Sequence, residues 1–159
     1  HPQRPQRASL QHQGLHLRRG IRVPAVARWP GRIPAGITSE QVCVTMDFTA
    51  SFARVAGARL PAGFAYDGAD VLDWVERRRP PQPRSLFWRG RRGENTRCAV
   101  RDGDLKYIVE RRGPQTREYL FDLAADTAEQ NDLAAARPAE LARLRARLAE
   151  WEAEVRPRR

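Results

Sequence analysis

Residues 138–155 read PAELARLRARLAEWEAEV, and this stretch decides the C-terminal half of the fold. Proline is well tolerated in the first turn of a helix, so Pro138 marks a helix start. Apolar residues then recur at steps of three and four, which places them on one stripe: Leu141, Leu144, Leu148, Trp151 and Val155. Most charged residues lie off this stripe. The pattern predicts a helix over residues 138–155 that packs on a sheet.

Four segments before this helix have the composition of strands: residues 85–89, 97–101, 105–110 and 118–123. Asp102-Gly103 separates the second from the third and is a hairpin signal. Residues 111–114, Arg-Arg-Gly-Pro, form a second turn. We therefore expect a small antiparallel sheet of four strands covered by the C-terminal helix.

The sequence of the first half of the chain predicts shorter helices and strands. Residues 20–28 are rich in apolar and β-branched side chains and predict a short buried strand. Asp47 is expected to cap a helix through Val55, with Phe48, Phe52 and Val55 on one face. Residues 58–68 are expected to be loop. Residues 71–76 predict a short helical turn that carries Leu72 and Val75 inward.

Residues 77–84, Arg-Arg-Arg-Pro-Pro-Gln-Pro-Arg, form the clearest boundary in the chain. Proline disfavours helix and sheet, and the like charges repel one another. We interpret the segment as a solvated linker. The alternative is that Arg77, Arg78 and Arg79 clamp a phosphate or a sulfate.

The chain has 159 residues, is 41% hydrophobic and carries a formal net charge of +10. Its length suits one soluble domain that buries roughly 68–70% of its unfolded surface. The charge indicates a polyanionic partner, such as nucleic acid, an acidic membrane or a sulfated glycan. A second explanation competes with this one. Lys106 is the only lysine, and a chain so rich in arginine is typical of a GC-rich genome.

Residues 1–19 are basic, carry three histidines and several glutamines, and lack an apolar pattern. We expect this segment to be disordered. It has no apolar core of the length a signal peptide requires, and no run in the chain approaches membrane-spanning length. We therefore expect no membrane partner.

Residues 20–32 read GIRVPAVARWPGR. This order resembles the sulfatase (arylsulfatase) family of sulfuric ester hydrolases, where Gly-Ile-Arg-Val-Pro-Ala and Trp-Pro-Gly-Arg follow an active-site lysine late in the catalytic domain. Five further segments are similar to the same family in the same order: residues 45–58, 67–72, 99–108, 118–123 and 124–133.

The resemblance implies an α/β fragment of an alkaline-phosphatase-like fold. Residues 20–76 would be the tail of the catalytic domain, residues 77–84 a linker, and residues 85–159 a C-terminal subdomain of four antiparallel strands and a helix. Residues 1–19 would then be a disordered or out-of-frame basic segment, because the resemblance stops there.

Sulfatases use a formylglycine made from the cysteine of a Cys-x-Pro-Ser-Arg motif, and a calcium ion held by Asp and Asn oxygens. Val44-Thr45-Met46 follows Cys43, and Ala99-Val100-Arg101 follows Cys98, so neither cysteine fits. We expect both to be free thiols. Gln13 stands near the position of the family lysine, and an amide does not supply its charge. We therefore assign no catalytic or metal-binding residue and no cofactor to this chain; calcium and formylglycine belong to the full-length family.

Trp88 and Arg89 are candidates for a substrate rim. The indole would stack on an aryl or sugar ring while the guanidinium reaches for an anion. The alternative is that Trp88 packs under the terminal helix. His12 and His16 are four residues apart but lack a third ligand, so we do not expect a metal there.

The leading hypothesis is a C-terminal part of a sulfatase-like hydrolase of sulfate esters, inactive alone. Its partners would be the missing N-terminal catalytic portion and, in the parent enzyme, a sulfate ester. The alternative is a basic binding module for nucleic acid or sulfated glycan. Of these two ligands, we expect nucleic acid less than sulfated glycan. A third reading is a remnant whose first half exposes apolar faces meant for a missing domain.

Overall fold

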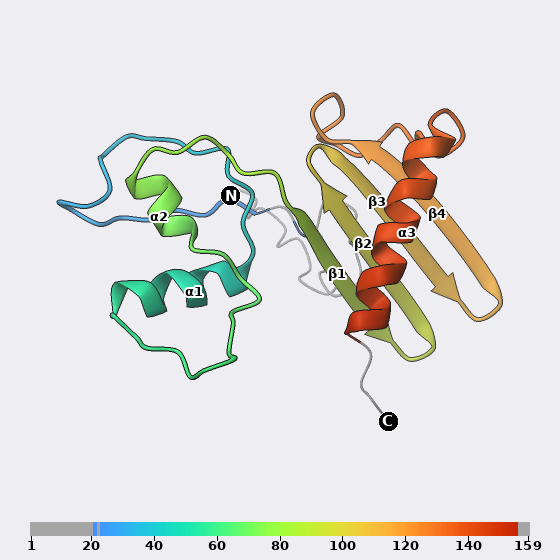
Figure 1. The fold of residues 1–159 in the computed structure, drawn as a ribbon. Helices are drawn as coiled ribbons and strands as arrows, with labels where there is room; N and C mark the ends of the chain where they lie inside the picture. The colour runs from blue at the N-terminus through green and yellow to red at the C-terminus, as the bar shows by residue number, and fades with distance from the viewer. Residues whose placement is uncertain (1–20, 22, 156–159) are drawn as a thin grey trace, which may run out of the picture. The chain divides into compact units, whose positions relative to one another are not determined.

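The computed structural model describes residue 21 and residues 23–155 (Figure 1). These residues form two compact units, and the division falls between Pro83 and Arg84. One unit is Pro24–Pro83. The other contains the chain from Arg84 onward together with Ile21 and Val23. The predicted disordered segment, residues 1–19, lies outside the described residues, as does residue 20 of the predicted first strand.

The second unit is built on a four-stranded antiparallel meander in the order β1-β2-β3-β4. Each strand has eight residues, two or more beyond each predicted range: β1 Ser85–Arg92, β2 Asn95–Asp102, β3 Leu105–Arg112 and β4 Gln115–Asp122. The predicted sheet is therefore confirmed, and its strands are longer than composition indicated.

The four strands have the same length because all three turns between them have two residues. Each turn begins with a glycine at a positive φ of 53–60°, and the three glycines are ten residues apart: Gly93, Gly103 and Gly113. The second turn residue has no positive φ, which is typical of a type II′ turn with glycine first. The turn after β2 is therefore centred on Gly103-Asp104, one residue later than the predicted Asp102-Gly103.

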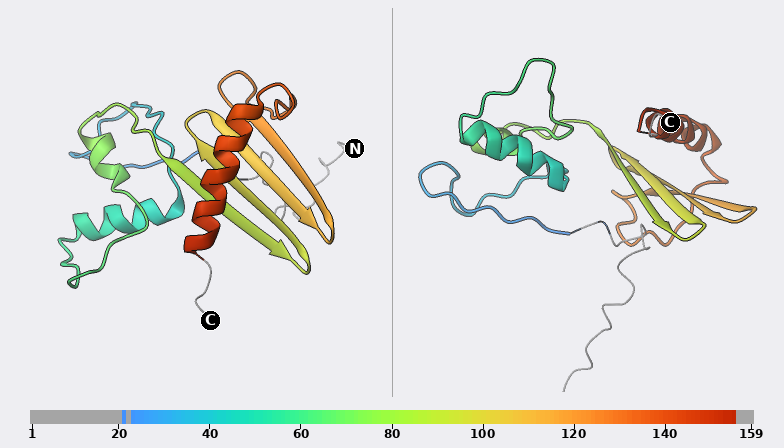
Figure 2. Two further views of the ribbon diagram at one scale, coloured as in Figure 1. Left: turned by 45° about the vertical axis from the view of Figure 1, so that its right-hand side comes forward. Right: turned by 90° about the horizontal axis from the view of Figure 1, so that it is seen from below.

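Helix α3 (Pro138–Glu154) crosses one face of this sheet (Figure 2). Leu144 and Leu148 are fully buried, in one core with residues of β2, β3 and β4: Cys98, Val100, Tyr107, Val109 and Leu120. Phe87 stacks on Trp151 with ring centroids 5.1 Å apart. The predicted helix and its packing on the sheet are confirmed. Val155 lies just beyond the helix and is 39% exposed.

The opposite face of the sheet has its own apolar cluster. Its buried members are Ala99, Ile108, Phe121 and Leu123, and Ile21, Trp88 and Tyr119 pack against them. Lys106 is also buried on this face, and its ammonium lies 2.8 Å from a carboxylate oxygen of Glu129.

The first unit contains α1 (Thr45–Val55) and α2 (Val71–Glu76). The predicted range of α2 is confirmed. Leu72 is buried as expected, but Val71 is buried beside it and Val75 is only half-buried. Arg32 and Arg54 both pair with Glu76, which joins α2 to α1 and to the loop before it.

Asp47 caps α1, but not from the predicted N-cap position: the helix begins at Thr45 with Val44 as its N-cap, and Asp47 is its third residue and the side-chain acceptor of a capping box. The Asp47 carboxylate accepts the Val44 amide at 2.7 Å and, 22 residues away, the Ala69 amide at 2.8 Å. The Ser51 hydroxyl donates to the Asp47 carbonyl and accepts the Leu72 amide. The buried face of α1 is therefore a polar one that holds the chain before α2.

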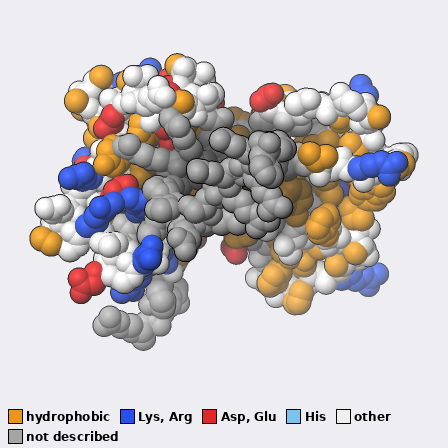
Figure 3. Space-filling model, turned by 180° about the vertical axis from the view of Figure 1, so that it is seen from behind, with side chains coloured by type: hydrophobic (Ala, Val, Ile, Leu, Met, Phe, Trp, Pro, Cys, Tyr) orange, Lys and Arg blue, Asp and Glu red, His pale blue; other side chains and the backbone are white. Residues whose placement is uncertain are grey.

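The apolar face of α1 is turned outward in this unit. Phe48 and Phe52 lie side by side with ring centroids 6.1 Å apart, and they share the predicted face. Phe52 is 60% exposed and Val55, on the same face, 39%. Apolar side chains gather over this unit on the right of the view in Figure 3.

The predicted strand over residues 20–28 is wrong for its described part. Residues 21 and 23–28 contain no strand, and Val26 is 95% exposed. A strand requires a neighbour that accepts and donates its backbone hydrogen bonds, and none of the described strands pairs with this segment. Its β-branched composition alone does not make it a strand.

Candidate functional site

Strand β1 places Trp88 and Arg89 on opposite faces of the sheet, because successive residues of a strand alternate. Trp88 packs against the cluster around Ile108, on the face away from α3. The alternative that Trp88 packs under the terminal helix is therefore wrong; its neighbour Phe87 takes that place. A single ligand on either face meets only one of the two rim candidates.

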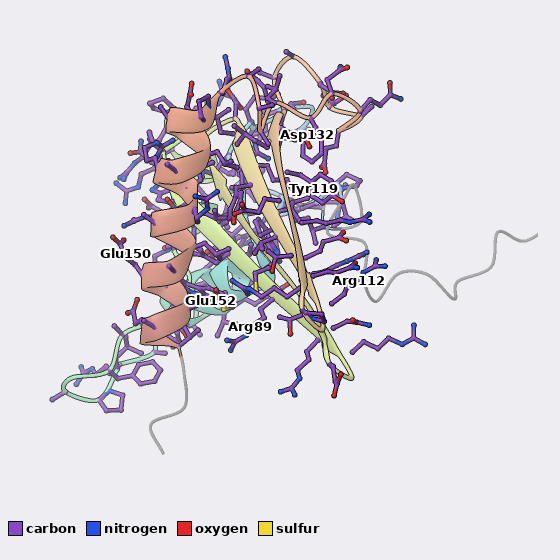
Figure 4. All side chains as sticks on the ribbon, turned by 90° about the vertical axis from the view of Figure 1, so that its right-hand side faces the viewer. Arg89, Arg112, Tyr119, Asp132, Glu150 and Glu152 are labelled. Atoms are coloured by element: carbon purple, nitrogen blue, oxygen red, sulfur yellow. The ribbon has the colours of Figure 1, made fainter. Side chains whose placement is uncertain are left out.

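On the α3 side, Arg89 lies over the Trp151 ring, 5.7 Å from its centroid. Arg111 donates two hydrogen bonds to Glu152 of α3, at 3.0 and 2.9 Å. The Cys98 thiol donates to the same carboxylate at 3.3 Å. Figure 4 shows Arg89 and Glu152 near the C-terminal end of α3.

The ionisation of this cluster fits a structural role better than a chemical one. Burial, assisted by the hydrogen bond to Glu152, raises the pKa of Cys98 to about 11, so the thiol is a protonated donor at neutral pH and not a nucleophile. Burial also acts to raise the pKa of Glu152, but the hydrogen bonds from Arg111 and Cys98 outweigh it and the net pKa is lowered. The cluster ties α3 to β2 and β3.

Two more ion pairs tie the same helix to the sheet. Arg145 donates two hydrogen bonds to Glu118, each 2.8 Å, and the Tyr107 hydroxyl donates to that carboxylate at 2.5 Å. Arg143 pairs with Asp102 at 2.5 Å. The arginine in each pair lowers the pKa of its carboxyl group.

We expect the sheet unit to lose stability in acid through these three pairs. Their carboxyl groups have folded pKa values below the ordinary 3.8 for Asp and 4.5 for Glu, so the stabilisation is fully present above those values and is lost as pH falls through the folded ones. Urea midpoints measured from pH 6 to pH 2.5 should fall below about pH 4.5. Glu118→Gln should reduce the decrease of the urea midpoint in acid. Glu150→Gln, which changes a side chain of α3 that is 70% exposed, should not. An equal slope in both variants would contradict the prediction.

The residues that would hold a catalytic metal are not brought together in this part of the chain. Within residue 21 and residues 23–155, no three His, Cys, Asp or Glu side chains lie close enough to hold an ion. Both cysteines are free, with Cys43 half-buried and Cys98 buried. Gln13, His12 and His16 lie outside the described residues. None of the described helices is long and apolar enough to cross a membrane.

Two features of the described residues escaped the sequence prediction. One is the buried pair of Lys106 and Glu129, whose members are 23 residues apart. The other is a group of arginines, one on each strand, on the face away from α3. The ten-residue spacing of the turn glycines was the signal that would have fixed the strand register and revealed the second.

Comparison with known proteins finds sulfatases. No family model matches the chain. It is 41% identical over 68 residues to human arylsulfatase G, which is 43% of this chain and 13% of that protein. It is 37% identical over 87 residues to the N-acetylgalactosamine-6-sulfatase of Sus scrofa, which is 55% of this chain and 16% of that protein. The chain is therefore similar to sulfatases over these stretches.

Solved structures agree on the fold. A protein whose structure was solved in complex with its substrate D-glucosamine-2-N,6-O-disulfate matches 79% of this chain with a TM-score of 0.66 and 21% identity, over 27% of its own length. The structure of Ps i-CgsB matches 77% with a TM-score of 0.64 and 22% identity, again over 27%. The sulfatase fold class expected from the resemblance is therefore confirmed. The chain spans between an eighth and about a quarter of the proteins it matches.

Proposed function

We propose that this chain is the C-terminal part of a hydrolase of sulfate esters and that it works with a larger catalytic portion. The similarity to two named sulfatases supports the reaction class. The small share of each relative that the chain spans supports the need for a further portion. Alone, the chain would be inert towards sulfate esters.

The observation that carries this proposal is the set of large apolar side chains that the Pro24–Pro83 unit leaves exposed, among them the outer face of α1. The members of this set are Val26, Met46, Phe52, Val55, Leu60 and Phe64. Soluble proteins seldom leave so many large apolar groups of one small unit in water, and such surfaces are usually covered by another part of a protein. The polar pair Asp47 and Ser51 already satisfies the inner face of α1, which leaves the outer face for that partner.

The described residues do not fit the family's calcium ion or its nucleophile. They offer no cluster of oxygen ligands of the size a calcium ion requires. The buried Cys98 holds its proton at neutral pH and sits in a strand, without the residues of the formylglycine motif. In this proposal the larger portion contributes calcium and formylglycine. Trp88 and Arg89 remain rim candidates, each for a ligand on its own face of the sheet.

A graft tests the proposal. Residues 20–155 replace the matching segment of human arylsulfatase G, and hydrolysis of 4-nitrocatechol sulfate is measured with calcium. We expect the graft to turn over substrate and the 159-residue chain alone to show no turnover above buffer. Phe52→Glu in the graft should lower the yield of active enzyme about tenfold or more, because it buries a charge against the partner.

The matched control is Arg59→Gln, which changes an exposed side chain of the same unit. It should leave the graft as active as its parent. Turnover by the isolated chain would overturn the claim that it is inert. A folded graft without activity would overturn the proposed function, and a Phe52→Glu graft as active as its parent would overturn the proposed role of the apolar face.

A further inference from the structure

The strand register gathers arginines on the face of the sheet away from α3. Residues directly opposite one another in an antiparallel pair share a face, so the pairs extend into rows across the sheet. Two adjacent rows at the hairpin ends of β1–β2 and β3–β4 hold Gly90, Arg97, Glu110 and Arg117, and then Arg92, Asn95, Arg112 and Gln115. Each strand contributes one arginine, and the four follow a zigzag across the sheet.

These rows are poor in acid, so their positive charge is only partly neutralised locally. Glu110 is their only carboxylate, and it pairs with Arg97 at 3.1 Å and with Arg112 at 3.5 Å. Among the described residues, no acidic side chain pairs with Arg92 or Arg117. Four arginines and one glutamate leave a formal charge of +3. By contrast, Arg111, Arg143 and Arg145 are engaged in the ion pairs that hold α3.

The same face offers a hollow and aromatic neighbours. Glu110, Arg112, Gln115 and Arg117 line a shallow hollow at the hairpin end of β3 and β4. The next row towards the middle of the sheet carries Trp88 and Tyr119 at its two ends, on β1 and β4. Tyr119 and Arg112 point to the same side of the sheet, away from the helix (Figure 4). Blue side chains gather over this unit at the left of Figure 3.

We propose that this arginine face, defined as Arg92, Arg97, Arg112 and Arg117, binds a sulfated sugar chain. Arginine forks match the oxygens of sulfate and carboxylate groups, and alternate strands separate the two arginines of a row by roughly 10 Å. The face thus binds several anionic groups spread along a polymer. This inference rests on the proposed function, because a second binding site would hold a sulfated sugar chain on a hydrolase that acts on it.

The aromatic spacing favours a sugar chain over single-stranded nucleic acid. Binding of single strands relies on successive bases stacked on neighbouring aromatic rings. Trp88 and Tyr119 lie three strands apart, with Ala99 and Ile108 between them. They provide two separate apolar edges beside the cations and no continuous stacking platform.

Titration of the full 159-residue chain with a heparin-derived hexasaccharide tests the inference without requiring activity. We expect binding that weakens steeply with salt. Arg92→Gln/Arg112→Gln/Arg117→Gln should weaken it about tenfold or more and make the salt dependence shallower, because fewer counterions are released. The charge-matched control is Arg28→Gln/Arg59→Gln/Arg78→Gln, three exposed arginines of the Pro24–Pro83 unit, which should change the affinity less than about twofold. Unchanged thermal unfolding shows that each variant is folded.

Equal weakening by both triple variants would overturn the inference, because net charge alone would then explain the binding. So would equally tight binding of a single-stranded oligonucleotide of the same charge with the same dependence on the arginine face. The hexasaccharide with its sulfates removed should not bind. An inactive graft together with intact hexasaccharide binding would reject the proposed function and leave the binding face standing, so the two failures are distinguishable.

Discussion

Lys106→Met is expected to lower the free energy of unfolding of the sheet unit by about 3–5 kcal/mol, because it leaves Glu129 buried without its cation. The two side chains are 1% and 0% exposed, and their atoms are 2.8 Å apart. The second oxygen of Glu129 already lacks a hydrogen-bond partner, so loss of the Lys106 ammonium would leave the carboxylate still less compensated. Urea unfolding at neutral pH, followed by circular dichroism, measures the loss.

The double variant Lys106→Met/Glu129→Met distinguishes a lost ion pair from lost packing. Replacing a whole buried pair by apolar side chains is often neutral or stabilising, so the double variant should recover most of the stability. Arg147→Met removes an ion pair between exposed side chains on α3 and should cost less than about 1 kcal/mol. If the double variant is as unstable as Lys106→Met, burial of the unpaired Glu129 charge is not the cause.

Gly68→Ala is expected to destabilise the Pro24–Pro83 unit by about 3 kcal/mol. A Cβ at this position would overlap the carbonyl of Met46 and lie 2.6 Å from the Asp47 nitrogen, both of them backbone. Backbone at the start of α1 cannot move aside without breaking the bonds that Asp47 makes to Val44 and Ala69. Hydrogen exchange of the Ala69 and Leu72 amides should therefore become roughly 100-fold faster.

Gly36→Ala is the matched control in the same unit. Gly36 has a φ of 71° and open space around its Cβ position, so the substitution costs only the strain of a left-handed residue, about 1 kcal/mol. The Ala69 and Leu72 amides should keep most of their protection in this variant. Equal exchange in Gly68→Ala and Gly36→Ala would show that the contact between Gly68 and α1 does not hold the unit together.

The sequence analysis missed both the arginine face and the buried pair of Lys106 and Glu129, for different reasons. The rows containing Arg97 and Arg112 follow from strand register, and the turn glycines at ten-residue intervals encode that register. The same alternation would have separated Trp88 from Arg89. The pairing of Lys106 with Glu129 has no such signal, because it depends on how the loop after β4 returns over the sheet.

Elements with a local cause could be predicted from the order of residues. A leucine stripe with proline at its first position made α3, and glycines free to adopt positive φ made the three turns of the sheet. This order also carried the resemblance that led to the sulfatase family. Tertiary structure alone decided the rest. Asp47 became a buried link to Ala69 in addition to its capping bond, and residues 23–28 stayed unpaired despite their β-branched side chains. A strand or a buried carboxylate is defined by partners distant in the chain, and local composition does not name those partners.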